Sequence, residues 1–410
     1  MILRLSSLIL AAWMATACSG GDLSTPPTPT PTLVAPPQSA APDYAIARLP
    51  AGPHMGIIVG FDGLVGGPYD RAARAEELLD VAANAGASIS RIQVDWSDLE
   101  MMPGQYDETS LTDALNGARA RGQSVFVTLS TLDSDGLTIP SDFLTPTGNL
   151  RSGLELSSPE VLLRFEQFLD WFVPILAREQ VWGLALGNEV DDPIREDRSL
   201  EAGALIFFET GRDRVKQLDP EMAVTVTLTI SSLPSLPEFT QSLHGFLDLA
   251  TLNHYCLQSD FTVTRVAQWD VDVQTMKDTA GELPIMIQEL GCPVGYGDGG
   301  AGAVPRSNTN LGSPTIQDEY FEYFQTLYEE DPQFRAATVF QLYDWSPTLA
   351  DMFGDMIRTD PSMNIFADRF AEWLATTGLC RWADGTCRPA WNTWIETLES
   401  QKARRESVDD

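Results

Sequence analysis

The stretch VWGLALGNEVDD, residues 181–192, places a run of residues suited to burial directly before a carboxylate. The segment from Val181 to Gly187 is apolar or small, and Asn188 and Glu189 follow it at once. Two interpretations fit this pattern. Glu189 is either an ordinary surface acid at a strand end or a catalytic acid held at the mouth of a barrel, and the rest of the chain decides between them.

Seven further stretches have the same near-continuous apolar character, which is typical of parallel strands buried on both faces. They are MGIIVGFD (55–62), ISRIQVDW (89–96), SVFVTLS (124–130), AVTVTLTI (223–230), FLDLATLNHY (246–255), PIMIQEL (284–290) and AATVFQLYDW (336–345). Amphipathic stretches with helix start and stop signals separate the runs, although residues 232–245 permit only a short helix. Eight strand–helix units predict an α/β fold, a single (β/α)8 TIM barrel with long βα loops.

The competing fold is a doubly wound parallel sheet. Such a sheet usually carries a glycine-rich phosphate-binding turn, GxGxxG, after its first strand. The segment VGFDGLVGGPYD (59–70) contains glycines but not this pattern. The sequence therefore favours the barrel.

The composition describes a strongly acidic globular protein. Among the 410 residues, 43% are hydrophobic and 20% are charged, so the chain can bury a full core and is not globally disordered. Its net charge of −32 disfavours nucleic acid and polyanionic substrates as partners. Neutral polymers or small neutral ligands remain compatible partners, and the acidity is also explained by solubility alone.

The N-terminus predicts an exported protein. Residues 1–17 resemble a signal peptide, with a basic start, an apolar core too short to span a membrane and an A-x-A motif at the end. The ATAC sequence that ends at Cys18 resembles a bacterial lipobox, so we expect lipidation of Cys18. Residues 18–50 then form a Pro/Thr-rich tether. We expect the domain (51–400) and a charged tail (401–410) to be anchored to the bacterial envelope, at the outer membrane or cell surface. Without lipidation, the protein would be periplasmic or secreted.

Four further cysteines lie in the predicted domain, and disulfides persist in exported proteins. Cys380 and Cys387 bracket an Asp-Gly turn signal, which predicts a small closed hairpin. Cys256 and Cys292 follow two runs that would be neighbouring strands, so we predict a second disulfide between them. The alternative is that these two are unrelated buried thiols.

Catalytic groups of such barrels lie at the carboxyl ends of the strands. The residues at these ends are Asp62, Asp95, Trp96, Asn188, Glu189, His254, Tyr255, Glu289, Asp344 and Trp345. Among them, Glu189 and Glu289 are the two glutamates, at the ends of the fourth and seventh runs. Hydrolysis of a glycosidic bond needs two carboxyl groups, one to protonate the leaving oxygen and one to stabilise or trap the oxocarbenium-like transition state. Asp62 and Trp96 are placed where sugar-binding subsites would form.

These residues resemble a known clan. GNE closing the fourth strand and a Glu closing the seventh are similar to the retaining (β/α)8 glycoside hydrolases that include cellulases, mannanases and β-1,4-galactanases. The resemblance implies that Glu189 is the general acid/base and that Glu289 is the nucleophile. It also implies that Asn188 binds the sugar 2-hydroxyl group.

Other positions extend the resemblance over nearly the whole predicted domain. Arg91 looks like the arginine of the second strand that lies near the nucleophile, and DLEMMPGQYD (98–107) resembles a loop common in the clan. Tyr255 matches the tyrosine that donates to the nucleophile, with His254 beside it as a candidate sugar ligand. Trp345 matches the tryptophan that forms the floor of the cleaved-sugar subsite, since sugar C–H faces pack on aromatic rings.

Each of these residues also has a purely structural interpretation. Arg91 can be an ion-pair partner of Asp95 or of another barrel acid. Tyr255 and Trp345 can be ordinary packing aromatics, and His254 is explained equally well as a structural histidine. Glu289 has the weakest structural interpretation, because a buried strand rarely places an acid at such a position without a function.

Other classes of enzyme fit the sequence poorly. The chain has three histidines, His54, His244 and His254, without the spacing of a zinc site, so we expect no metal. No G-x-S-x-G motif of a serine hydrolase occurs. The expected function is therefore a cofactor-independent, monomeric glycoside hydrolase that acts on β-glycosides of a neutral oligo- or polysaccharide with retention. The alternatives are a non-catalytic carbohydrate-binding lipoprotein on the same fold and a transglycosylase of envelope glycans.

The segment GYGDGGAGAVPRSNTNLGSP (295–314) follows the seventh predicted strand. Long loops in compact domains are usually functional or disordered. We expect this loop to overhang the cleft, where it would narrow the cleft or contact the substrate.

Overall fold

The structure is a computed structural model that describes residues 44–59, 70–298, 306–358 and 361–408. The predicted signal peptide, Cys18, most of the tether and Asp62 lie outside these residues. So does the centre of the glycine-rich loop.

Each of the eight apolar runs forms a parallel strand, as predicted. The strands are β1 (His54–Ile58), β2 (Ile89–Asp95), β5 (Ser124–Ser130), β8 (Gly183–Ala185), β9 (Ala223–Thr225) with β10 (Thr227–Thr229), β11 (Ala250–Tyr255), β12 (Ile285–Gly291) and β13 (Phe334–Phe340). They pair in the orders β1-β13-β12-β11-β10 and β2-β5-β8-β9. Val226 joins the two groups between β9 and β10. At the other side, the Ser88 amide before β2 donates to the Met55 carbonyl of β1 at 2.9 Å.

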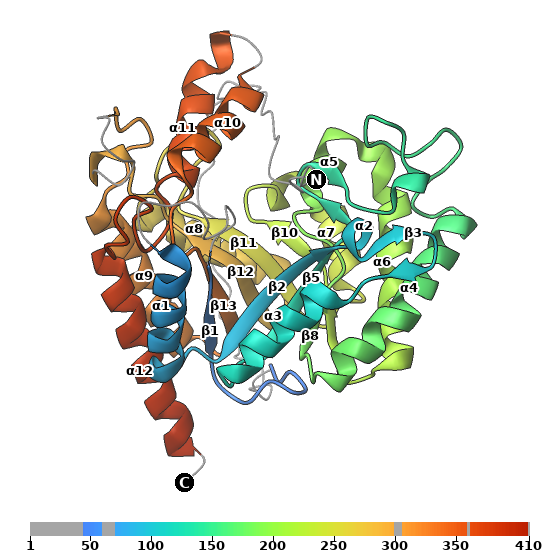
Figure 1. Cartoon of the computed structure of the whole chain (residues 1–410), viewed down its shortest axis with the longest axis horizontal. Coiled ribbons are helices and arrows are strands. Elements are labelled where there is room, and N and C mark those ends of the chain that lie inside the picture. The colour runs from blue at the N-terminus through green and yellow to red at the C-terminus, as the bar shows by residue number, and fades with distance from the viewer. Residues whose placement is uncertain (1–43, 60–69, 299–305, 359–360, 409–410) are drawn as a thin grey trace, which may run out of the picture.

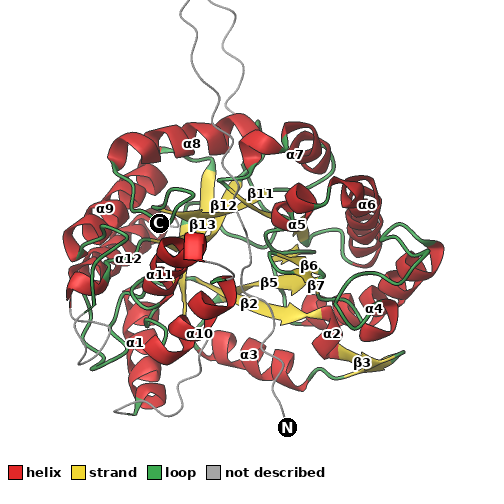
Figure 2. Ribbon diagram, turned by 90° about the horizontal axis from the view of Figure 1, so that it is seen from above, coloured by secondary structure: helices red, strands yellow, loops and turns green. Residues whose placement is uncertain are grey.

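A helix follows each strand of this ring, so the architecture fits a (β/α)8 barrel (Figure 2). In strand order these helices are α1 (Arg71–Ala85), α3 (Thr109–Ala120), α4 (Pro159–Arg178), α6 (Glu201–Leu218), α7 (Pro237–His244), α8 (Val266–Ala280), α9 (Pro314–Glu330) and α12 (Pro389–Val408). The short helix expected within 232–245 is α7. Helix α12 continues to Val408, so the segment predicted as a charged tail from residue 401 is helical for most of its length.

Smaller elements occupy the connections after the strands. They are α2 (Trp96–Leu99), β3 (Glu100–Met102), β4 (Gln105–Tyr106), β6 (Leu132–Asp133), β7 (Gly136–Leu137), α5 (Asp191–Glu196), α10 (Pro347–Ile357) and α11 (Asn364–Leu374). Helices α10 and α11 form a pair that projects beyond the rest of the barrel (Figure 1). The long connections therefore gather at one end of the barrel, where they surround the candidate site.

Large apolar side chains close the barrel at the opposite end. Phe126, Trp182 and Met286 belong to one buried cluster inside the strands, and Ile46 and Leu49 complete it. These last two residues precede β1 and lie within the segment predicted as tether. The packed domain therefore begins before Ile46, because both side chains contribute to its core.

Both predicted disulfides are present. Cys256 and Cys292 are joined with their α-carbons 5.0 Å apart, and they tie the ends of β11 and β12 together. Cys380 and Cys387 close the small hairpin before α12.

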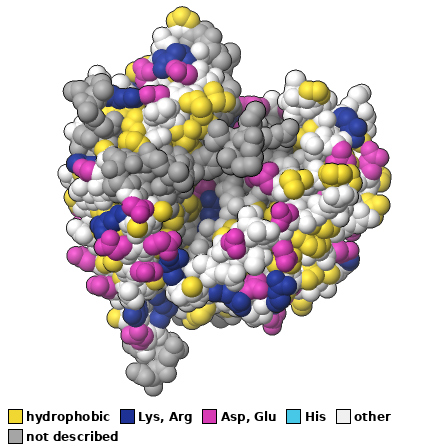
Figure 3. Space-filling model, in the orientation of Figure 1, with side chains coloured by type: hydrophobic (Ala, Val, Ile, Leu, Met, Phe, Trp, Pro, Cys, Tyr) yellow, Lys and Arg dark blue, Asp and Glu magenta, His cyan; other side chains and the backbone are white. Residues whose placement is uncertain are grey.

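The exterior carries the acidity seen in the sequence. Acidic side chains are spread over the face shown in Figure 3, between apolar and basic ones. None of the helices in the described ranges is both long enough and apolar enough to cross a bilayer.

Candidate active site

Glu289 lies at the carboxyl end of β12 with a cation and a phenol against its carboxylate. Arg91 Nη1 donates to Oε1 at 2.9 Å, and Tyr255 Oη donates to Oε2 at 2.5 Å. The side chains of Arg91 and Glu289 are 4% and 7% exposed, so this ion pair is largely shielded from solvent. Both contacts were predicted from the resemblance. Both donors are placed to stabilise negative charge on this carboxylate.

A β-bulge in β12 explains how two consecutive polar residues, Gln288 and Glu289, can both face the inside of the barrel. The pairing of β11 with β12 moves from Leu252–Ile287 to Asn253–Glu289, so Gln288 is an extra residue in β12. Gln288 Oε1 accepts from Thr128 Oγ1 at 2.7 Å and Thr227 Oγ1 at 2.9 Å inside the barrel. A β-bulge re-aims a side chain in this way, and here Glu289 is displaced to the mouth.

Glu189 lies shortly after the end of β8 at Ala185, in a strained backbone conformation. Its φ of 47° is in the left-handed region, which non-glycine residues rarely adopt and which is often found at functional sites. Asn253 Nδ2 donates to its Oε1 at 2.8 Å. Burial, and then the charge of Glu289, raise the pKa of Glu189 well above the usual range of a glutamate. Glu189 therefore tends to hold a proton. The Glu289 carboxylate, in contrast, accepts hydrogen bonds from Arg91 and Tyr255.

Asn188 is fixed by two partners of opposite kind. Its Oδ1 accepts from Gln288 Nε2 at 2.8 Å, and its Nδ2 donates to Asp133 Oδ1 at 3.1 Å. One acceptor and one donor define which way the amide faces. Asn188 and Glu189 thus share the barrel mouth with Glu289, as the sequence predicted.

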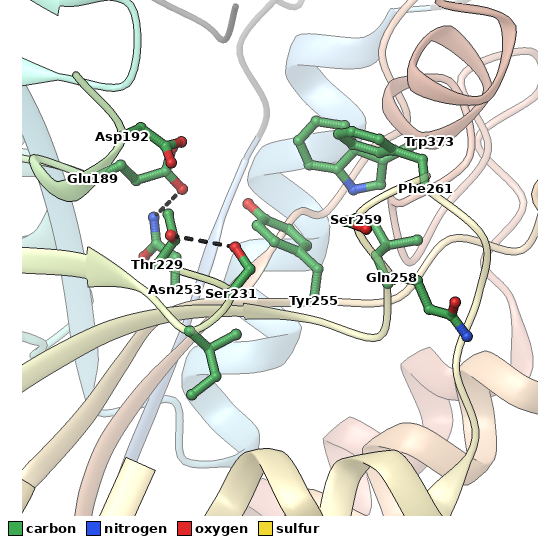
Figure 4. Close-up of a pocket in the computed structure, with 12 residues that line it drawn as sticks. Glu189, Asp192, Thr229, Ser231, Asn253, Tyr255, Gln258, Ser259, Phe261 and Trp373 are labelled. Atoms are coloured by element: carbon green, nitrogen blue, oxygen red, sulfur yellow. Dashed lines mark hydrogen bonds between the residues drawn. The ribbon is translucent and has the colours of Figure 1, made fainter. Parts of the chain in front are cut away.

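A pocket opens beside Glu189 (Figure 4). Glu189 and Asp192 lie on one side of it, and Tyr255, Phe261 and Trp373 lie on the other. The rest of its lining is Thr229, Ile230, Ser231, Asn253, Leu257, Gln258 and Ser259. An apolar wall opposite convergent polar groups is the usual form of a small-molecule site.

Trp373 reaches this pocket from α11, which is held down by the glycine-rich loop. The neighbouring Glu372 is fully buried, and its carboxylate accepts from the backbone amides of Tyr296, Thr309 and Asn310 at 2.8–2.9 Å. The described parts of the loop therefore position the aromatic wall through α11.

Of the predicted ligands in the described residues, Tyr255 lines this pocket. Arg91 and Asn188 do not line it but contact Glu289 and Gln288, respectively. Trp96, His254 and Trp345 lie away from the site. Trp96 is fully buried among Phe165, Phe168 and Phe207, because α2 begins at Trp96 and turns its ring outward to the surrounding helices. Its Nε1 donates to Glu100, so its role is structural.

His254 is also a structural residue. Successive residues of a strand face opposite sides, so His254 points away from the mouth served by Asn253 and Tyr255. Its Nδ1 lies 2.6 Å from Tyr320 Oη and its Nε2 lies 3.0 Å from Asp272 Oδ2. The prediction of a sugar ligand here was wrong.

Trp345 was assigned to the floor of the subsite on the assumption that the eighth strand reaches it. The strand ends at Phe340, and Trp345 is fully buried against Phe353 of α10. The aromatic residues near Tyr255 are instead Phe340 and Trp373, with ring centroids 5.7 and 5.0 Å from it. Trp345 therefore lies in the core beneath α10 rather than in the pocket.

Buried acids around the mouth predict that stability depends on pH. Burial raises the pKa of Asp133 to about 7, and burial with the charge of Asp192 also raises the pKa of Asp191. A carboxyl whose folded pKa exceeds its unfolded pKa contributes stability below the unfolded value, and this contribution is lost as the pH rises through the folded value.

We therefore expect the thermal midpoint to fall by several degrees between about pH 5 and pH 8. Calorimetry of the wild type and of Asp133→Asn in this range measures the effect. The slope should be smaller in the variant, and an equal slope in both proteins would contradict this assignment.

The fold is one that glycoside hydrolases use. An exo-β-1,4-mannosidase from Opitutaceae bacterium strain TAV5 superposes with a TM-score of 0.59 at 16% identity, over 87% of this chain and 60% of that chain. This chain thus spans less than two thirds of the mannosidase. A GH5_18 variant from Streptomyces cattleya, in complex with Manβ1-4GlcNAc, gives 0.60 at 17% identity, over 88% and 82% of the two chains.

β-Glucuronidase 2 from Bacteroides uniformis, in a variant of its calcium site, gives a TM-score of 0.53 at 15% identity, over 84% of this chain and 34% of that chain. No protein-family model matches the sequence. No curated protein sequence matches it either. At these identities the structural likeness establishes the fold, so the function must be argued from the site.

Proposed function

We propose that the protein is a retaining glycoside hydrolase that acts on β-glycosides, with Glu289 as nucleophile and Glu189 as general acid/base. The observation that carries the proposal is the contrast between these two glutamates. Glu289 is paired with Arg91 and accepts a hydrogen bond from Tyr255. Glu189 is buried, accepts a hydrogen bond from the neutral Asn253, and has its pKa raised by burial and by the charge of Glu289. A carboxylate held by two donors suits a nucleophile, and a carboxyl group with a raised pKa suits a proton donor.

The reaction follows from these two roles. The Glu289 carboxylate attacks the anomeric carbon, and the glycosidic bond breaks as Glu189 gives its proton to the departing oxygen. Glu189, now ionised, then takes a proton from water, whose oxygen attacks the anomeric carbon and releases Glu289. Two inversions give net retention, and no cofactor is needed.

Arg91 and Tyr255 orient the Glu289 carboxylate and stabilise its negative charge before attack. Their donors also stabilise the carboxylate again when it leaves the glycosyl-enzyme. Asn253 holds Glu189 through the hydrogen bond to Oε1, which leaves the other oxygen for the proton.

The charge of the pocket favours a neutral sugar. Glu189 and Asp192 line it, and no Lys, Arg or His is among the described residues of its lining. A uronic acid would place a carboxylate against these acids without a compensating cation. We therefore infer that the substrate is a neutral β-glycoside rather than a β-glucuronide, although a β-glucuronidase has a similar fold.

The substrate experiment is a panel of aryl β-glycosides and neutral β-glycans, with a β-glucuronide included. Cleavage of a neutral glycoside at least about tenfold faster than the glucuronide is expected, since a factor of ten corresponds to about 1.4 kcal/mol. Proton NMR of the first product then gives the anomer, and a β-anomer formed from a β-glycoside supports retention. Binding of a neutral glycan without cleavage would instead identify a carbohydrate-binding protein, and transfer to added acceptor sugars would identify a transglycosylase.

The pocket lies beside the proton donor, so it is placed to receive the leaving group. Trp373 supplies an indole there, on which the C–H face of a sugar can pack. We expect Trp373→Ala to raise KM for an oligosaccharide roughly tenfold and to change KM for a small aryl glycoside little. Steady-state kinetics on both substrates measure this, with Met352→Ala, an exposed change on α10, as control. An equal effect on both substrates would contradict the placement.

Export and anchoring at Cys18 belong to the same proposal. A lipidated N-terminus followed by the Pro/Thr-rich tether would hold a monomeric domain at the bacterial envelope, where glycans are accessible. Incorporation of labelled palmitate that Cys18→Ala abolishes is the expected result. Labelling that persists in the variant would show that Cys18 is not the lipidated residue.

A further inference from the structure

Asp133, at the end of β6, is a buried carboxylate on which side chains from both halves of the candidate site converge. It is 1% exposed. Its Oδ1 accepts from Asn188 Nδ2 at 3.1 Å and from the Ser134 amide at 2.7 Å. Its Oδ2 accepts from Ser130 Oγ at 2.8 Å and from Gln93 Nε2 at 3.2 Å.

The contacts of Asp133 continue to both glutamates. Gln93 Oε1 accepts from Arg91 Nη2 at 2.5 Å, and Arg91 Nη1 holds Glu289. On the other side, Asn188 is the residue directly before Glu189. Asp133 is therefore connected to the nucleophile Glu289 through the side chains of Gln93 and Arg91. It is connected to the acid/base Glu189 through Asn188, the neighbour of Glu189 in the chain.

An ionised carboxylate satisfies each of these contacts as an acceptor. All the partners of Asp133 are donors, and an ionised carboxylate is acceptor-only. A protonated carboxyl or an amide would direct a hydrogen toward one of these donors. The hydroxyl of Ser130 or Ser134 could accept this hydrogen. A neutral group is nevertheless a weaker acceptor than a carboxylate, so the contacts with Asn188 Nδ2 and Gln93 Nε2 would loosen.

We propose that ionised Asp133 is a positioning residue of the reaction, which fixes the Asn188 amide and, through Gln93, the Arg91 guanidinium beside Glu289. The inference rests on the proposed function. It adds a regulation by pH, because the positioning is lost when Asp133 takes up a proton.

The charged groups around Asp133 locate this transition. Burial raises its pKa to about 7, and the nearby Asp135 raises it too, while the hydrogen bonds from Ser130, Asn188 and Ser134 lower it. Glu189 is also coupled to Asp133 by charge, and Arg91 reaches it only through Gln93. Activity should therefore rise with pH through about 7 as Asp133 ionises. It should fall at higher pH as Glu189 loses its proton.

The kinetic test compares Asp133→Asn, Asn188→Ala and the double variant, with Asp135→Asn as a matched control. Misplacement of reacting groups by about 1 Å can cost roughly 100-fold, so Asp133→Asn should lower kcat by about this factor and KM by less than about threefold. The acid limb near neutral pH should disappear in this variant and persist in Asp135→Asn. The double variant should lose clearly less than the product of the two single losses, because both changes remove the contact between Asp133 and Asn188. Independent, multiplying effects or a persistent acid limb would overturn the proposal.

A measurement without turnover separates this inference from the proposed function. The side-chain amide of Asn188, observed by NMR in asparagine-labelled protein and assigned with Asn188→Asp, should shift with a midpoint near pH 7. The shift should be absent in Asp133→Asn. If the wild type cleaves no glycoside, the proposed function fails. The pH dependence of the Asn188 amide signal still tests whether Asp133 binds Asn188. An amide that does not respond to pH would overturn the positioning role even in an active enzyme.

Discussion

Glu289→Ala is expected to lower kcat/KM by roughly 10⁴-fold or more on every substrate that the wild type cleaves. The glycosyl-enzyme cannot form without this carboxylate, and Arg91 is left as an uncompensated buried cation. Steady-state kinetics with an aryl β-glycoside measure the loss. Added azide should restore turnover by entering the space of the removed carboxylate, and it should yield a glycosyl azide of inverted anomeric configuration.

The control for Glu289→Ala is Arg91→Met, which removes the cation but keeps the nucleophile. It should retain more activity than Glu289→Ala and should not respond to azide. Activity of Glu289→Ala within about tenfold of the wild type would show that another group traps the sugar.

Glu189→Ala is expected to have an effect that depends on the leaving group. General acid–base catalysis contributes roughly 10²- to 10⁴-fold, and a glycoside with a poor leaving group should lose this much in kcat/KM. A dinitrophenyl glycoside needs little protonation, so its glycosylation step should slow far less. The slow step then becomes hydrolysis of the intermediate, which should appear as a burst of released phenol in stopped-flow measurements.

The pH profile distinguishes this role from a structural one. The alkaline limb of the wild type reports loss of the proton that Glu189 holds because its pKa is raised. That limb should vanish in Glu189→Ala. Asp192→Asn is the matched control, since it removes a neighbouring acid of the pocket without removing the proton donor. An unchanged alkaline limb in Glu189→Ala, or equal losses for good and poor leaving groups, would assign the proton to another residue.

The sequence predicted the parts of the site that follow from strand ends. Parallel buried strands deliver their carboxyl-terminal residues to one end of a barrel, so Glu189 and Glu289 were placed together before any geometry was known. Arg91 lies in β2 and Tyr255 ends β11, and their contacts with Glu289 were expected from the resemblance.

The residues that were missed depend on features that apolar runs do not show. Asn253 could have been found by alternation, since it lies two residues before Tyr255 and must face the same side. Asp133 lies in a short loop strand after β5, and its importance comes only from the donors that converge on it. Trp373 lies on a helix of the last long connection, where nothing in the local sequence indicates proximity to the mouth.

The incorrect assignments have equally local causes. Trp96 begins a helix rather than ending a strand, so its ring turns into the helix layer. Trp345 lies beyond the true end of β13 at Phe340, and the chain has already turned beneath α10. Strand limits are the least certain feature of an apolar run, and a shift of a few residues moves a side chain from the site to the core.

The most direct test of the central claim is covalent trapping of the nucleophile. The wild type is incubated with a 2-deoxy-2-fluoro glycoside of the sugar that it cleaves, and the digested protein is mapped by mass spectrometry. The account predicts one glycosyl group, attached to Glu289 and absent from Glu289→Ala. A label on another residue, or hydrolysis that gives the inverted anomer with no label at all, would contradict it.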